Sequence, residues 1–430
     1  MKTLEFDRIR EKVIQVDHPS GLKVFVIPKK GYHKVYATFA TNYGSIDNTF
    51  IAPGETEQTR VPDGIAHFLE HKLFEQEDGS VMDKFSKLGS EPNAYTDFTQ
   101  TVYLFSCTDG FEENFRLLMH YVQHPYLTDE NVEKEKGIIA QEIKMYQDNA
   151  DWRVFFNLLG AMYEKHPVKI DIAGTVDSIS QITKETLYKC YNTFYHPSNM
   201  ILVVVGDVDP DTVFKMADDN IIARDNPGNI QKIFPEETHG HKSQLVERKL
   251  AVAMPQFQMG IRDKSGMTGY ELPRRKICLE IMLSMLMGRS SLLYNQLYNE
   301  GLINQSFGAD ATLEESYGFT AWGGQSNDPV RCAQRISEAI QKVQQEGLAR
   351  NQFDRIRKAH EGRFIRSLNS PENISQAFIP LAFKGTNYFE FARVYAELTL
   401  ADVEKVFQEH FALEPVLSII WPSGSQDKNG

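Results

Sequence analysis

Three residues that can do chemistry lie within five positions of one another near the start of the chain. His67, Glu70 and His71 fall in the stretch DGIAHFLEHKLFE, residues 63–75. At 3.6 residues per turn, the three side chains share one face of a helix. Two imidazoles four residues apart can both reach one zinc ion, and a carboxylate beside the second can take a proton from water that the metal polarises. The stretch therefore predicts a metal centre with a general base next to it.

The same stretch must form a helix that packs against a core. Ile65, Phe68, Leu69 and Leu73 make an apolar stripe on roughly the opposite face. Asp63, which follows a proline, is the expected N-cap. The pattern H-x-x-E-H is the inverse of H-E-x-x-H, and both are zinc-peptidase motifs. A helix with two solvated histidines has the same pattern, so a further ligand is needed to decide.

A second helix offers that ligand, because tetrahedral catalytic zinc needs three protein ligands and the first helix supplies two. The helix is predicted over residues 128–146, where TDENVEKEKGIIAQEIKMY opens on a capping box. Glu135 and Glu142 lie seven residues apart on one face of it. Solvated carboxylates are the alternative interpretation, because this helix carries many other charges.

The composition is that of a globular chain long enough for two domains. It has 430 residues, of which 41% are hydrophobic and 24% are charged, and its formal net charge is −12. This charge argues against nucleic acid or an anionic membrane as the main partner. The N-terminus lacks an apolar signal segment, and the longest apolar run, residues 200–205, has the length of a strand. We therefore expect a cytoplasmic protein without a membrane span.

Strands and helices are predicted on both sides of the histidine helix. Residues 21–47 contain two strand-like runs, LKVFVIPKK and YATFATNYGS, which we expect to pair as a hairpin beside it. A helix over residues 81–88, a strand over 101–107 and a helix over 112–122 follow. A buried strand is expected over residues 200–206.

The second half of the chain repeats the first. ITKETLYKCYNTFY at residue 182 matches LTLADVEKVFQEHF at residue 398 in its apolar positions, and a buried strand follows each. LTDENVEK at residue 127 similarly resembles LARNQFDR at residue 348. The second copy has lost the chemistry, since LSMLM at 283–287 stands opposite H-F-L-E-H. One half is therefore expected to be catalytic and the other to be its paired wall.

These repeats predict an α+β fold of two homologous domains, each a β-sheet packed by helices. The catalytic zinc-binding domain is expected over residues 1–223 and the homologous non-catalytic domain over residues 243–430. Residues 224–242, which contain the turn sequence RDNPGN, are expected to be the interdomain linker.

In these residues the chain resembles a known family, the M16 metallopeptidases, which include pitrilysin, insulin-degrading and mitochondrial processing peptidases. Within that family it is most similar to the YmfH-like bacterial members. The resemblance covers essentially the whole chain. It rests on H-F-L-E-H at 67–71, G-x-x-x-N-A-x-T at 89–96, and the two glutamates at 135 and 142. It implies a half-clamshell of two domains with mixed, largely antiparallel sheets, and a zinc endopeptidase that cleaves extended or unfolded peptides.

The resemblance also implies roles for the matched residues. His67, His71 and Glu142 are the implied ligands of one Zn²⁺ per chain, and Glu70 is the implied general base. Glu135 is implied to be a carboxylate outside the ligand set that orients the site.

Two further residues are implied to bind substrate. Asn93 and Ala94 belong to a segment that in the family lies at a sheet edge, where an extended peptide adds as a strand.

One part of the family pattern is missing. In the second half the family places an Arg and, seven residues later, a Tyr, which hold the substrate backbone and the oxyanion. Here Leu297 or Tyr298 stands in the Arg position and Asn304 in the Tyr position, while Arg289 lies out of register.

We therefore expect this chain to be the H-x-x-E-H subunit of a heterodimer, whose paralogous M16 partner supplies the Arg and Tyr as the two close around the peptide. A self-sufficient homodimer is the alternative. A non-catalytic assembly subunit is a third interpretation, against which the intact motif argues.

Overall fold

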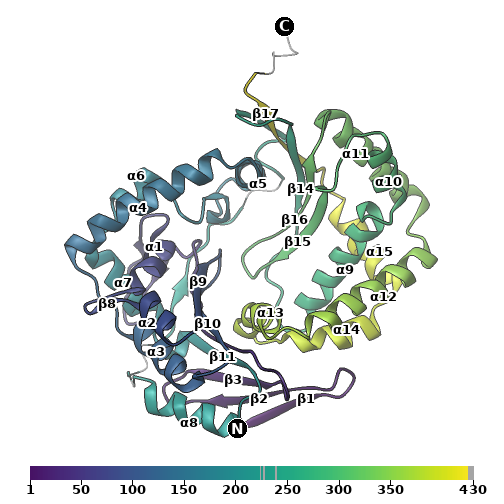
Figure 1. Cartoon of the computed structure of the whole chain (residues 1–430). Helices are drawn as coiled ribbons and strands as arrows, with labels where there is room; N and C mark the ends of the chain where they lie inside the picture. The colour runs from purple at the N-terminus through teal and green to yellow at the C-terminus, as the bar shows by residue number, and fades with distance from the viewer. Residues whose placement is uncertain (223, 226–227, 238–239, 425–430) are drawn as a thin grey trace. The chain divides into compact units, whose positions relative to one another are not determined.

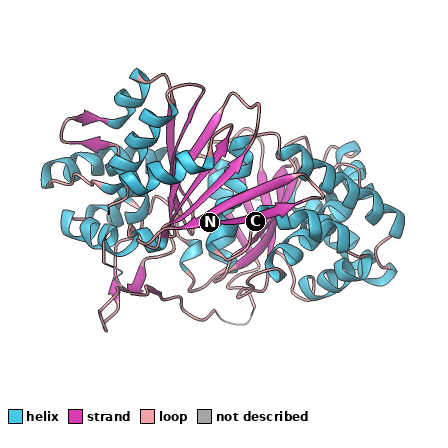
Figure 2. Ribbon diagram, turned by 90° about the horizontal axis from the view of Figure 1, so that it is seen from below, coloured by secondary structure: helices cyan, strands magenta, loops and turns pink. Residues whose placement is uncertain are grey.

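The chain folds into two compact units, each built around one large sheet. The computed structural model describes residues 1–430 except 223, 226–227, 238–239 and 425–430. Unit 1 comprises Met1–Ile143, Ile170–Phe234 and Ile365–Phe389, and unit 2 comprises Lys144–Lys169, Pro235–Phe364 and Glu390–Gly430. In both, helices pack beside the strands, as Figure 2 shows. The predicted α+β fold with two homologous halves is confirmed.

The sheet of unit 1 has the strand order β1-β2-β3-β11-β4-β10-β9 (Figure 1). β11 runs parallel to β3, and the other neighbouring strands are antiparallel. β9 lies at one edge of this sheet. The strands are β1 (Lys2–Phe6), β2 (Glu11–Asp17), β3 (Lys23–Pro28), β4 (Val35–Thr41), β9 (Glu91–Thr96), β10 (Thr101–Cys107) and β11 (Met200–Gly206).

The expected hairpin between β3 and β4 is wrong, because β11 lies between these two strands. β11 is the uninterrupted apolar run MILVVVG, and every residue in it is buried. Such a strand needs a neighbour on each side and a covered face on each side, which only a central place in the sheet provides. The segment that separates β3 from β4 in space therefore comes from more than 150 residues further along the chain.

Helices of unit 1 cover this sheet, and α1 packs on β9 and β10. α1 begins after Gly64, whose φ of 90° lies in the left-handed region. A Cβ there would meet the carbonyl oxygen of Ala173 at 2.4 Å, so the turn into α1 requires glycine. Asp63 is therefore not the N-cap, and its carboxylate accepts hydrogen bonds from Asn48 and Arg60 instead. The helices are α1 (Ile65–Leu73), α2 (Val81–Lys87), α3 (Phe111–Gln123), α4 (Asp129–Asp148, which ends in unit 2), α6 (Val176–Ser180), α7 (Lys184–Phe194), α8 (Pro210–Asn220) and α13 (Pro371–Phe383).

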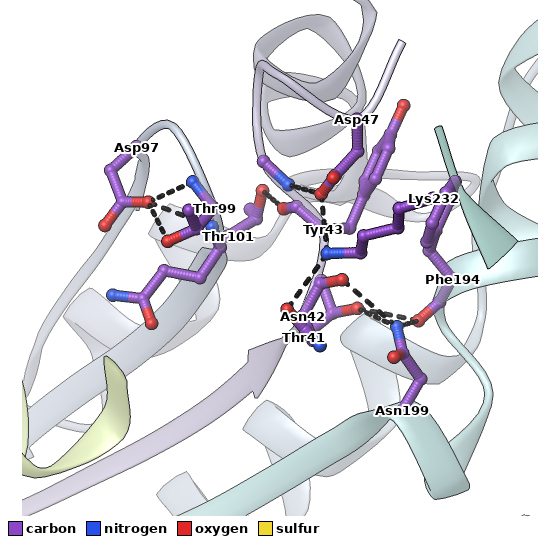
Figure 3. Close-up of polar contacts among 12 residues, drawn as sticks. Thr41, Asn42, Tyr43, Asp47, Asp97, Thr99, Thr101, Phe194, Asn199 and Lys232 are labelled. Carbon is purple, nitrogen blue, oxygen red and sulfur yellow. Dashed lines mark hydrogen bonds and ion pairs between the residues drawn. The ribbon is translucent and has the colours of Figure 1, made fainter. Parts of the chain in front are cut away.

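β12 (Gln231–Lys232) is held to the rest of unit 1 by an ion pair between a partly buried lysine and a buried aspartate. β12 joins β5 (Thr49–Ile51) and β6 (Thr59–Arg60) in a small sheet. A separate two-stranded sheet is formed by β7 (Glu75–Gln76) and β8 (Gly79–Ser80). Lys232 Nζ donates to Asp47 Oδ2 at 2.9 Å and to Asn42 Oδ1 at 3.0 Å (Figure 3). Burial raises the pKa of Asp47 although Lys232 lowers it. The paired ammonium therefore offsets the cost of a buried carboxylate.

Unit 2 repeats the core of unit 1. Its sheet has the order β13-β17-β14-β16-β15, with β13 and β17 parallel and the other pairs antiparallel. This is the arrangement of β3-β11-β4-β10-β9. The strands are β13 (Leu245–Leu250), β14 (Gln256–Arg262), β15 (Gly308–Leu313), β16 (Gly318–Gln325) and β17 (Val416–Pro422). The helices are α5 (Ala150–Met162), α9 (Glu271–Met287), α10 (Leu292–Asn299), α11 (Pro329–Glu346), α12 (Arg350–Ser367, which ends in unit 1), α14 (Phe391–Glu397) and α15 (Leu400–His410).

The units differ from the predicted contiguous domains because two helices are exchanged. α5 follows α4 in the chain but packs on β14 and β17 of unit 2. α13, which follows α12 in the second copy, packs on β11 and β4 of unit 1. The boundaries at 223 and 243 stay a prediction, and part of the expected linker, residues 226–227 and 238–239, lies outside the described residues.

Within the described part of the chain, no single helix has the length and apolar character to cross a membrane. Among the described helices, only α9 and α10 taken together, two helices bent by 44° at the break between them, have the length and apolar composition that a crossing would need.

Candidate metal centre

α1 presents both predicted histidines and Glu70 from one helix. Its apolar stripe is buried, as predicted, with Ile65 at 3% exposure and Phe68, Leu69 and Leu73 at 0%. Because that stripe fixes the rotation of the helix about its axis, the side chains at 67, 70 and 71 are held on the other face. The imidazole rings lie 4.5 Å apart between their centroids.

α4 brings both predicted glutamates to the same place. Glu142 Oε1 lies 3.6 Å from His67 Nε2, and Glu142 Oε2 lies 3.6 Å from His71 Nε2. Glu135, two turns earlier on α4, accepts a hydrogen bond on Oε1 from His71 Nδ1 at 3.1 Å. The seven-residue spacing therefore places one carboxylate against each end of the His71 ring.

The donor atoms of His67, His71 and Glu142 fit a single metal ion. They lie within 4.8 Å of one another, and all three side chains are half-buried. A distance of 3.6 Å is too long for a hydrogen bond. It is the separation of two ligands of one tetrahedral zinc, which bonds of about 2.0–2.2 Å set at about 3.3–3.6 Å. Two nitrogens and a carboxylate are also a common donor set of catalytic zinc.

Charge and hydrogen bonding hold Glu135 ionised against His71. Burial raises the pKa of Glu135, but the hydrogen bond from His71 and the charges of His71 and Lys72 lower it below its usual value. Burial lowers the pKa of His71, whereas the hydrogen bond to Glu135 and the charges of the surrounding carboxylates raise it above its usual value. His71 Nδ1 is thus the nitrogen committed to a carboxylate, which leaves Nε2 for a metal.

Lys72 is a feature that the sequence analysis missed. Its side chain is fully buried, at 0% exposure, and it forms ion pairs with Glu75 and, at 3.7 Å, with Glu135 Oε2. The signal was present in the sequence, because position 72 lies three residues after Leu69 and four after Phe68, within the apolar stripe. A lysine at such a position predicts a buried carboxylate partner.

Glu70 is buried beside the ligands, at 8% exposure, and it is held by a residue of the edge strand. Thr96 Oγ1 on β9 donates to Glu70 Oε2 at 2.7 Å. Thr96 is part of the G-x-x-x-N-A-x-T pattern, but the sequence alone gave its hydroxyl no role.

The backbone N–H and C=O groups of β9 face β10 at one residue and the open edge of the sheet at the next. Asp97 N donates to Gln100 O at 2.9 Å in the turn to β10. Because backbone groups alternate along a strand, the odd positions of β9 then face β10 and the even positions face the open edge. Pro92, which has no N–H, lies at an even position. The outward N–H groups are therefore those of Ala94 and Thr96.

The backbone N–H of Asn93 therefore faces β10, whereas that of Ala94 faces the open edge. The N–H of Ala94 donates to Asn93 Oδ1 at 2.9 Å, so the Asn93 side chain covers an outward donor while its own backbone faces β10. The structure places both residues on the edge strand, where a peptide strand can be added.

In unit 2 the Arg position holds Leu297 or Tyr298 and the Tyr position holds Asn304, so neither has the side chain of the family pattern. Leu297 on α10 is fully buried. Asn304 Nδ2 donates to Gln325 Oε1 at 2.8 Å, and Asn304 Oδ1 accepts from the N–H of Ser306. Arg289 donates to the carbonyl of Gln305.

Two family profiles match the chain. The one described as "Insulinase (Peptidase family M16)" matches residues 49–176, and "Peptidase M16 inactive domain" matches residues 181–359. The Bacillus subtilis (strain 168) protein "Uncharacterized zinc protease YmfH" is 44% identical over 96% of this chain and 97% of that protein. "Uncharacterized zinc protease YmxG" of the same strain is 23% identical over 87% of this chain and 92% of that protein.

Solved structures agree in fold. The crystal structure of a putative M16-like peptidase from Alicyclobacillus acidocaldarius has a TM-score of 0.93 and 37% identity, over 98% of this chain and all of that one. A protease from Helicobacter pylori has a TM-score of 0.81, but its 18% identity, over 96% of this chain and 100% of that one, supports the fold alone. Fold and site together define a two-half α+β chain with an H-x-x-E-H centre in its first half. The chain belongs to the M16 peptidase family.

Proposed function

We propose that this chain is a zinc endopeptidase whose metal centre is formed by His67, His71 and Glu142, with one ion per chain. The observation that carries the proposal is that His67 Nε2 and His71 Nε2 each lie 3.6 Å from an oxygen of Glu142, with the buried carboxylate of Glu70 on the helix of the two histidines. A zinc ion in such a site acts as a Lewis acid toward water and toward a peptide carbonyl.

The other residues have distinct tasks in this proposal. Glu70 accepts the proton of the attacking water and later gives it to the leaving amine. Glu135 orients His71 through Nδ1, and Lys72 holds the second oxygen of Glu135. The substrate is an extended or unfolded peptide, because a strand added to β9 at Ala94, beside Asn93, must have its backbone free. The cytoplasm is the proposed compartment.

The proposed assembly is a heterodimer with a paralogous M16 subunit that lacks H-x-x-E-H and carries the Arg and Tyr. Leu297 and Asn304 support this, because Leu297 has no donor and the Nδ2 of Asn304 donates to Gln325 Oε1. Loss of one oxyanion donor typically costs about 10²–10³ in rate. The self-sufficient homodimer is the alternative, and Tyr298, which is 45% exposed, is the residue that favours it.

The test measures metal and cleavage together. Purified chain is analysed for zinc, and cleavage of an unstructured peptide library is followed for the chain alone, with its paralogue, and with a paralogue whose Arg is changed to Ala. We expect stoichiometric zinc, weak cleavage alone and strong cleavage with the intact paralogue. Full activity of the isolated chain would favour the homodimer. Stoichiometric zinc without cleavage in any combination would favour an assembly subunit.

A further inference from the structure

The carboxylate of Glu70 has one hydrogen-bond donor among the described side chains. That donor is Thr96, whose Oγ1 lies 2.7 Å from Oε2. The last torsion of a glutamate side chain is broad, so packing alone leaves the carboxylate plane poorly fixed. One short hydrogen bond to a charged acceptor is enough to choose its orientation.

The direction of this hydrogen bond follows from counting protons. Each threonine hydroxyl has a single proton, and an ionised carboxylate can only accept. Thr101 Oγ1 lies 3.3 Å from Thr96 Oγ1, but it donates to the carbonyl of Tyr43 at 2.9 Å. The Thr101 proton is therefore committed elsewhere, and the Thr96 proton goes to Glu70. Oε1 of Glu70 is then the oxygen left for a water proton.

Thr96 also belongs to the edge that faces an added peptide. Its backbone N–H points to the open side of β9, while its side chain reaches α1. The same residue thus offers a backbone pairing site on one side and holds Glu70 on the other. A peptide that pairs with β9 would fix the backbone of Thr96 and, through its hydroxyl, the position of the base.

We infer that Thr96 is a positioning residue, which aligns Glu70 for proton transfer and connects that alignment to the strand where the peptide binds. This inference rests on the proposed peptidase function. The competing explanation is that a half-buried hydroxyl merely finds its nearest acceptor, in which case removing it would affect folding but not the chemical step.

The test compares Thr96→Val, which keeps the shape and removes the donor, with Thr96→Ser, which restores the donor. Thr101→Val is the matched control, because it removes a neighbouring hydroxyl that does not donate to Glu70. Thr96→Val should lower kcat about 10-fold to 100-fold with KM and zinc content unchanged. Thr96→Ser should recover most of kcat, and Thr101→Val should leave kcat within about twofold.

A second readout does not depend on activity. Crystal structures of the zinc-free variants should show the Glu70 carboxylate turned away in Thr96→Val and retained in Thr96→Ser. An active wild-type enzyme with an unchanged Thr96→Val variant, or an unmoved Glu70 in that variant, would overturn the inference. An inactive wild type under every assay condition would instead count against the proposed function, and the crystal structures would still decide the role of Thr96.

Discussion

At the scale of single residues, the proposed roles of Glu70 and the ligands predict different losses. Glu70→Gln should keep zinc and lose turnover, because a carboxamide cannot accept the proton while the three ligands are intact. His67→Ala and Glu142→Gln should lose the metal, because each removes or weakens one of only three protein ligands. Zinc content by elemental analysis and peptide cleavage together separate these outcomes. A fully active Glu70→Gln enzyme would refute the role of the base.

Glu135 should give an intermediate result. Glu135→Gln keeps a hydrogen-bond acceptor for His71 but removes the charge, and such changes around a metal site typically cost about 10-fold to 100-fold in affinity or activity. Competition with a zinc chelator measures this affinity. A loss as complete as that of Glu142→Gln would instead make Glu135 a ligand.

Lys72 makes a prediction about folding rather than catalysis. Lys72→Met leaves Glu135 buried without that cation, and breaking a buried pair in this way costs about 3–5 kcal/mol. Because His71 still contacts Glu135, we expect a loss of about 3 kcal/mol, measured by urea unfolding of the zinc-free protein. Lys84→Met is the matched control, since Lys84 pairs with the exposed Asp78 and such pairs contribute under about 1 kcal/mol. Equal effects of the two variants would contradict the structural role of Lys72.

At the scale of elements, β9 predicts opposite results for two neighbouring prolines. Ala94→Pro removes an N–H that faces the open edge, where proline is tolerated, so the protein should fold with normal zinc content. Peptide cleavage should fall about 5-fold to 10-fold, because an added peptide would lose the N–H that it takes over from the Asn93 side chain. Asn93→Pro removes an N–H that faces β10, so it should instead lower the midpoint of thermal unfolding. Unchanged cleavage in Ala94→Pro would place the peptide elsewhere.

Elements whose structure is determined by local pattern were predictable from the sequence. β10 and β11 have the predicted bounds, 101–107 and 200–206, and α1 and α4 present the predicted faces. Pairing between distant segments was not predictable in the same way. The insertion of β11 between β3 and β4 depends on where a buried strand finds two neighbours, and nothing local to residues 21–47 encodes it. Thr96 was missed for the same reason, because Glu70 lies on another element. Lys72 differs, because its place in the apolar stripe of α1 signalled a buried partner, although not that one partner is Glu135 on α4.

At the scale of the whole molecule, the repeat predicted two homologous halves but not the exchange of α5 and α13. Each of these helices is amphipathic and occupies a corresponding place in its copy, so periodicity cannot say which sheet it will cover. The exchange means that neither unit is a single continuous segment of chain. A fragment that ends at residue 223 would lack α13 and would leave part of the faces of β11 and β4 without their cover.

Acid should destabilise the whole molecule through two buried histidines of unit 2. Burial lowers the pKa of His166 to about 4, although the charge of Glu237 raises it, and burial together with Arg363 lowers the pKa of His360 to about 4. His166 Nδ1 accepts a hydrogen bond from the N–H of Val168, which only an unprotonated nitrogen can do.

The sign of this effect follows from the unfolded state. An unfolded histidine, with a pKa of about 6.5, binds a proton as the pH falls, while each folded histidine does so only near its own pKa. Stability is therefore lost as the pH falls from about 6.5 to about 4, by about 3 kcal/mol for each histidine over the full range. Carboxylates with lowered pKa values, such as Asp263, act below this window.

Urea unfolding of the metal-free protein at pH 7 and pH 5 measures the effect. His166→Asn offers an amide oxygen in place of Nδ1, and His360→Gln offers an amide to the hydroxyl of Ser284, which lies 2.8 Å from His360 Nε2. Between pH 7 and pH 5, the free energy of unfolding of each variant should fall by about 2 kcal/mol less than that of wild type. Other histidines, including His196 with its lowered pKa and His71 with its raised pKa, are common to all the proteins, so their contributions cancel in the comparison. If both variants lost as much stability as wild type, neither histidine would be held neutral by the fold.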